Sequence, residues 1–273
     1  MATSPTEWQI LALGAFAGLT IFLGMPIARA RSISNRTRAA LGAVAVGILL
    51  FLFVDVLSNA HGIVVAAVTG TGSSRVTTGA EDVLVLLLGF GLGVISLLYF
   101  EGLFTRRVAR AADFSPDGTA PSLSPMQLST IIAVGIGLHN LSEGLAIGAA
   151  YAAGLPLAIV LVIGFAIHNS TEGFGILGPG MMAGSRYSYR RLLALGVVGG
   201  GPTFLGTVIG SLFSSDVLSV LFYGLAAGAI LFVVLQMSRP MLAPATREVV
   251  LSLLVLGFAL GVLTDFIVTV GGA

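Results

Sequence analysis

A six-residue pattern that contains histidine and glutamate occurs twice in this sequence. The first copy, residues 139–144, reads HNLSEG, and the second, residues 168–173, reads HNSTEG. In each copy the histidine precedes the glutamate by four residues, so on a helix both side chains lie on one face. Both copies lie within long apolar stretches, where ionisable side chains are costly unless something binds them. Imidazole and carboxylate groups together are typical ligands of a divalent transition-metal ion.

The composition is that of an integral membrane protein. Of the 273 residues, 56% are hydrophobic and 9% are charged, whereas about 25% of the residues of a typical soluble domain are charged. The sequence contains no cysteine, which excludes disulfides, thiolate metal sites and iron–sulfur clusters. It also contains no phosphate-binding loop, no dinucleotide-binding glycine motif and no basic nucleic-acid patch. We therefore expect no nucleic-acid partner.

The apolar runs are long enough for eight membrane-spanning helices, since one crossing needs about 20 apolar residues. They predict an all-α membrane protein in which residues 1–273 form a single transmembrane domain. The predicted spans are residues 8–28, 39–60, 82–104, 127–151, 155–178, 191–213, 217–237 and 249–269. The longest connections are residues 61–81 and 105–126, and the second is rich in Pro, Asp and Ser, which predicts a cytoplasmic loop.

Basic residues orient these spans. All thirteen are arginine, and all but Arg75 fall in or beside four connections on one side of an eight-span protein. The positive-inside rule makes that side cytoplasmic, so both termini are expected outside the cytoplasm. Nothing positively charged precedes the first span, so we expect a retained helix rather than a cleaved signal peptide.

The fourth and fifth spans carry the two motifs and should form a helical hairpin. Only residues 152–154 connect them, so both motifs reach a similar depth in the membrane. Four ligands can therefore converge there: His139, Glu143, His168 and Glu172. Asn140 and Asn169 add amide oxygens one residue along. A single buried histidine often serves helix packing alone, but two matching copies favour a ligand role, and sites near the midplane at an internal repeat are typical of transporters.

The paired HNxxEG motifs, on adjacent spans of an eight-span protein with outward termini, resemble the ZIP family (Zrt-, Irt-like proteins) of divalent metal transporters. The resemblance covers the whole chain in topology and is specific in the fourth and fifth spans. It implies a ZIP-like bundle of three, two and three helices with inverted-repeat symmetry, and usually a homodimer. It also implies an elevator-type mechanism, in which spans one, four, five and six move against spans two, three, seven and eight.

The same resemblance assigns the metal ligands. It implies a primary site formed by His139, Glu143, His168 and Glu172. It implies a neighbouring second site that draws on Asn140 and Asn169, with Glu172 as the bridging ligand.

The sequence departs from the family pattern at several positions. Ser142 and Thr171 stand where the family often has proline, and their hydroxyl groups can bond back to a carbonyl one turn earlier. Gly201 stands where many members carry a glutamate, so the second site lacks one ligand. In the seventh span, Gln236 and Met237 replace two usual metal-binding residues.

Other polar residues are candidates for the transport path. Asp55 and His61 lie toward the outer end of the second span, where they could capture metal, although a solvated interface position is an equal alternative. Gln236 could line the inner path, and interhelical hydrogen bonding explains it equally well. Asp265 and Glu101 lie near span ends and are expected to reach the membrane interface.

The expected function is transport of a divalent metal ion into the cytoplasm across the plasma or inner membrane, not an enzymatic reaction. Zinc is the expected substrate, with iron, manganese, cobalt, nickel and cadmium as further candidates. Besides the metal ion, the expected partners are the lipid bilayer and a second copy of the chain. Two alternatives stay open: a membrane metalloenzyme with a di-metal His/Glu site, and a transport-deficient ZIP relative that senses metal.

Overall fold

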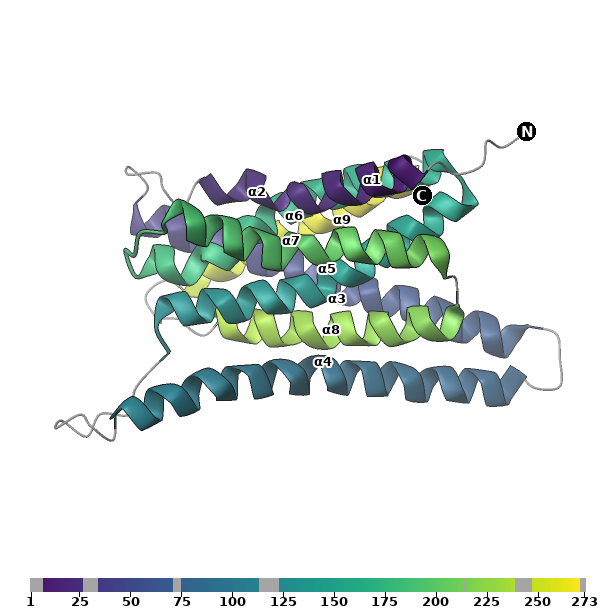
Figure 1. Ribbon diagram of the computed structural model, residues 1–273, viewed down its shortest axis with the longest axis horizontal. Coiled ribbons are helices and arrows are strands. Elements are labelled where there is room, and N and C mark those ends of the chain that lie inside the picture. Colours follow the sequence, from purple (N-terminus) through teal and green to yellow (C-terminus); the bar gives the residue numbers. More distant parts are fainter. Residues whose placement is uncertain are drawn as a thin grey trace.

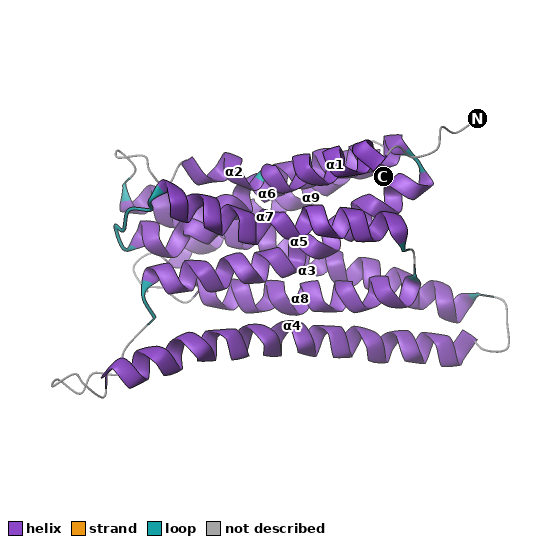
Figure 2. Ribbon diagram, in the orientation of Figure 1, coloured by secondary structure: helices purple, strands orange, loops and turns teal. Residues whose placement is uncertain are grey.

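The computed structural model describes residues 7–26, 34–70, 75–112, 123–213, 215–238 and 247–270, which form helices and no strand (Figure 2). The helices are α1 (Glu7–Leu19), α2 (Ile21–Gly24), α3 (Asn35–Thr69), α4 (Arg75–Ala112), α5 (Pro125–Ala153), α6 (Leu155–Met182), α7 (Tyr189–Leu212), α8 (Asp216–Ser238) and α9 (Arg247–Val270). Eight segments are long and apolar enough to cross a membrane, with α1 and α2 together forming the first. The predictions of an all-α fold and of eight helical segments of membrane-spanning length are confirmed for the described residues.

Two of the predicted connections are shorter than expected. The connection over residues 61–81 was expected between spans, but α3 continues to Thr69 and α4 begins at Arg75. Likewise, α4 extends to Ala112 into the predicted loop over residues 105–126, of which residues 113–122 lie outside the described part. Hydropathy measures only the part of a helix that matches the hydrocarbon core, whereas the helix itself continues until a residue ends its backbone hydrogen bonding. For α3 that residue is Gly70, whose backbone is extended.

The helices pack in two groups. The motif group consists of α1, α2, α5, α6 and α7, and the flanking group consists of α3, α4, α8 and α9. The most extensive contacts join α5 to α7 in the motif group, and α4 to α8 and α3 to α9 in the flanking group. In Figure 1, α4 and α8 lie at one edge of the bundle and α1 and α2 at the opposite edge. The start of α1 and the end of α9 lie at the same end of the bundle (Figure 1).

Glycine allows the helices within each group to approach closely. A Cβ atom at Gly144 of α5 would lie 2.9 Å from the Gly206 Cα of α7, and one at Gly89 of α4 would lie 3.3 Å from the Gly224 Cα of α8. Contacts between the two groups involve side chains. For example, a Cβ atom at Gly175 of α6 would lie 3.4 Å from the terminal methyl group of Met237 of α8. The GxxxG spacings of the sequence therefore bring backbones together inside each group.

Candidate metal site

The two motifs lie on α5 and α6, which form the predicted hairpin around Gly154. A capping box starts α5, with the Ser124 and Gln127 side chains each bonded to the other residue's backbone. Within the motifs, the Ser142 hydroxyl donates to the His139 carbonyl at 2.7 Å, and the Thr171 hydroxyl donates to the His168 carbonyl at 2.7 Å. These bonds confirm the expected back-bonding of Ser142 and Thr171.

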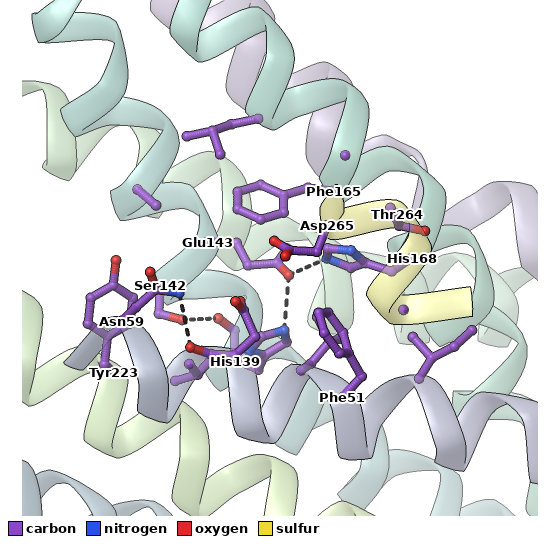
Figure 3. Close-up of a pocket in the computed structure, with 18 of the residues that line it drawn as sticks. Phe51, Asn59, His139, Ser142, Glu143, Phe165, His168, Tyr223, Thr264 and Asp265 are labelled. Carbon is purple, nitrogen blue, oxygen red and sulfur yellow. Dashed lines mark hydrogen bonds and ion pairs between the residues drawn. The ribbon is translucent and has the colours of Figure 1, made fainter. Parts of the chain in front are cut away.

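The four predicted ligands converge in one buried cluster. One oxygen of Glu143, Oε1, lies 3.0 Å from His139 Nε2 and 2.5 Å from His168 Nε2. The Oε1 atom of Glu172 lies 3.7 Å from His139 Nε2. Figure 3 shows Glu143 between the two histidines. All four residues are at most 7% exposed, so the cluster lies in the interior of the bundle.

Several polar atoms of this cluster have no hydrogen-bond partner. They are Nδ1 of His139, Oε2 of Glu143 and both carboxylate oxygens of Glu172. Buried polar groups almost always find a partner, because an unsatisfied one costs about 1–3 kcal/mol and a charged one costs more. A bound cation would satisfy the free carboxylate oxygens of Glu143 and Glu172 together, while each histidine would offer it one ring nitrogen.

The spacing of the ligand atoms fits a transition-metal ion. Atoms held tetrahedrally at about 2.0–2.2 Å from zinc lie about 3.4 Å from one another. One ligand atom from each of His139, Glu143 and His168 lies within 4.8 Å of the other two. Small side-chain movements would therefore bring these three atoms into coordination with one ion. A ligand set of two imidazoles with carboxylates favours zinc or iron over calcium or magnesium.

The asparagines of the two motifs are anchored to neighbouring helices. Asn140 Nδ2 donates to the Gly199 carbonyl of α7 at 3.0 Å, and Asn169 Nδ2 donates to the Ala17 carbonyl of α1 at 3.3 Å. Both side chains are fully buried, and the Oδ1 atom of each has no hydrogen-bond partner. Gly201 lies half-buried on α7 and offers no side-chain ligand.

A cavity of about 390 Å³ joins the cluster to one end of the bundle. His139, Glu143 and His168 line it together with residues of α3, α8 and α9, including Asp55 and Asp265. Its lining runs along α3 toward Thr69 and along α9 toward Val270, so it leads to the end of the bundle at which α1 starts. Figure 3 shows Asp265 in the same pocket as Glu143 and His168.

The cavity is acidic. None of the described residues that line it is an arginine, whereas Asp55, Glu143 and Asp265 are all acidic. A cleft lined by one sign of charge with apolar walls focuses its field and concentrates the counter-ion, in this case a cation.

Of the three candidate path residues, only Asp55 is among those that line the cavity. Asp55 lines the cavity, as the capture role requires. His61 is exposed on α3 and is not among the lining residues, and Gln236 is buried on α8 away from the cavity.

Sequence reasoning missed the role of Asp265, which was expected only to reach the membrane interface but lines the cavity. A signal was present in the last span, because Gly261, Thr264, Asp265 and Thr269 recur at helical spacing and all four line the cavity. A small and polar stripe on an otherwise apolar helix indicates a face turned away from lipid.

Comparison with models of protein families gave no match to this chain, and a search of curated proteins gave none either. The functional argument therefore depends on the geometry of the site.

Proposed function

We propose that this chain is a ZIP-like transporter that carries a divalent transition-metal ion, foremost zinc, across a membrane. Iron, manganese, cobalt, nickel and cadmium are further candidate substrates. The observation that carries the proposal is the buried cluster of His139, Glu143, His168 and Glu172 at the inner end of a cavity in a membrane-type bundle. A bound ion in the interior with a path to one side is what a transport site requires.

The arginines support uptake rather than export. Most arginines of the described residues are found at the start of α3, the end of α4, the start of α7 and the start of α9, opposite the start of α1 and the end of α9. The exception is Arg75, the first residue of α4. The positive-inside rule makes the arginine-rich end cytoplasmic. The termini then face outward and the cavity opens to the outside, which is the conformation that receives an ion for uptake across the plasma or inner membrane.

The packing supports movement of one group of helices against the other. Backbone-to-backbone glycine contacts tie α5 to α7 and α4 to α8, so each group is expected to move as a rigid body. The groups meet through side chains such as Met237, which is flexible and repacks at low cost. All four metal ligands belong to the motif group, so a sliding motif group would carry the ion with it. Such a movement is an elevator-type mechanism, as proposed for a bundle of three, two and three helices with inverted-repeat symmetry.

The flanking group supplies the first contact with the ion. Asp55 on α3 and Asp265 on α9 line the outer part of the cavity, while the cluster lies on α5 and α6. An incoming cation would be attracted by these two carboxylates, lose part of its water, and pass to Glu143 and the histidines. A neighbouring second position would lack one ligand, because Gly201 offers no side chain.

A metal sensor is the second candidate function. The observation that favours it is the loss of side-chain ligands at Gly201 and Met237, because a chain that binds but cannot release metal inward would report metal rather than move it. Met237 is buried and lies against Gly175, on the inner side of the cluster.

Uptake of zinc, iron and manganese into proteoliposomes tests the proposal, with the native chain compared to Glu172→Ala. Flux in the native chain that is lost in the variant supports a transporter with its site on α5 and α6. Tight metal binding without flux of any ion favours the sensor. Hydrolysis or oxidation of a substrate by purified protein without flux would instead favour a membrane metalloenzyme. A homodimer, expected from the family resemblance, is tested separately by the mass of the purified protein in detergent.

A further inference from the structure

Each motif contains an asparagine whose amide group bonds to another helix of the motif group. Asn140 directly follows His139, and successive residues of a helix point about 100° apart. His139 therefore faces the cavity while Asn140 faces α7, where its Nδ2 donates to the Gly199 carbonyl at 3.0 Å. The second motif repeats the arrangement, since Asn169 follows His168 and donates to the Ala17 carbonyl of α1 at 3.3 Å.

One of these bonds crosses an interface built on glycine. The interface between α5 and α7 brings the two backbones close at glycines such as Gly144 and Gly206, and glycine contributes no side chain there. A side-chain hydrogen bond across this interface adds a directional contact that fixes the rotation of α5 about its own axis. Rotating α5 by about 10° would move a side-chain tip at the outer radius of the helix, about 5–6 Å, by about 1 Å.

Such a displacement is large compared with what a metal site tolerates. Coordination distances are held within about 0.2 Å of their preferred values, and His139 and Glu143 both project from α5. A hydrogen bond from a buried amide to a backbone carbonyl fixes the rotation of the motif helix at the level of the ligands. It also leaves the amide oxygen of each asparagine without a partner.

We infer that Asn140 and Asn169 are positioning residues of the metal site, and that they act through their amide N–H groups. The inference rests on the metal site of the proposed function and deepens it. It differs from a role as oxygen ligands, which would depend on Oδ1 and would not need the bonds to Gly199 and Ala17. The two roles predict opposite effects of replacing the amide by a carboxylate.

The test is Co²⁺ binding to the purified full-length protein in detergent, followed by the d–d absorption of the bound ion. Asn140→Asp keeps a side-chain oxygen and adds a negative charge, which by itself strengthens cation binding, but it removes the N–H group that bonds Gly199. We expect affinity to fall by about 10- to 100-fold, as for other residues that orient metal ligands, with a changed absorption spectrum. Asn59→Asp is the control for the added charge, because Asn59 also lines the cavity but bonds the Asp55 carbonyl of its own helix at 3.0 Å and no other helix; it should not weaken binding.

Equal or tighter Co²⁺ binding by Asn140→Asp, with an unchanged spectrum, would overturn the inference and favour an oxygen ligand. Asn169→Asp provides the same comparison on α6 and decides the matter if Asn140→Asp does not fold. The expected loss is smaller there because the bond is longer. If the wild-type protein itself binds no Co²⁺, the proposed metal site fails, and that result is distinct from failure of the positioning role.

Discussion

Glu143 is the centre of the cluster, and replacing it by glutamine gives the sharpest test of the site. A single oxygen of this carboxylate lies 3.0 Å from His139 Nε2 and 2.5 Å from His168 Nε2. Glutamine has the same shape and can still accept a hydrogen bond from an imidazole N–H at Oε1. The Glu143→Gln variant should therefore fold, while losing the negative charge that a cation requires.

The expected loss of metal affinity follows from the number of ligands. Removing a residue that only orients a ligand typically costs about 10- to 100-fold in affinity. Glu143 is one of three residues whose ligand atoms lie within 4.8 Å of one another. Because it would be a direct ligand, its removal should lower the metal affinity by at least about 100-fold. A 100-fold loss corresponds to about 2.7 kcal/mol of binding free energy.

Titration calorimetry of zinc in detergent and zinc uptake into proteoliposomes would measure the effect. Glu101→Gln is the matched control, since Glu101 lies half-buried on α4 and does not line the cavity. Glu143→Gln should bind zinc about 100-fold more weakly and show no uptake at zinc concentrations that saturate the control. Wild-type affinity and uptake in Glu143→Gln would refute the assignment of the cluster as the transport site.

Three further predictions follow from the same structure. Asp265→Asn should raise the zinc concentration for half-maximal uptake several-fold with little change in maximal rate, and the effect should shrink in high salt because screening weakens attraction of the ion. An unchanged half-saturating concentration would contradict a role in capture. Zinc affinity should fall between about pH 7.5 and about pH 5.5, because bound imidazole and carboxylate ligands must first lose their protons; affinity independent of pH would argue against these ligands. Tyr187→Phe should lower the free energy of unfolding by about 1–3 kcal/mol, measured by thermal unfolding in detergent. The Tyr187 hydroxyl donates to the Leu177 carbonyl at 3.0 Å, accepts from the Gly180 N–H at 3.1 Å and lies 2.7 Å from the Ser129 hydroxyl. Burial raises the pKa of Tyr187, so this donor stays protonated, and equal stability of the phenylalanine variant would show that the bonds contribute nothing.

Much of the site could be predicted from the sequence because its geometry is local. A histidine and a glutamate four residues apart share a helix face wherever the helix lies. The short connection around Gly154 then makes α5 and α6 antiparallel neighbours, and this brings His139 and Glu143 to His168 and Glu172. The back-bonding of Ser142 and Thr171 is likewise confined to one turn.

The features that the sequence did not reveal all join residues far apart in the chain. Asp265 reaches the cavity only because α9 packs beside α3 and α6, and nothing within α9 specifies those neighbours. The same holds for the bond from Asn140 to Gly199, which connects residues separated by 59 positions.

The sequence by itself thus determined that the chain has eight helical segments long and apolar enough to cross a membrane, and that two histidines and two glutamates lie at one depth in the bundle. Apolar length and helical periodicity are properties of single segments, and a tight turn joins the two segments that matter. The tertiary structure alone decided which helices form the two groups, where the cavity opens and which acidic residues line it. These depend on how glycine-lined surfaces of separate helices fit together, which no single segment encodes.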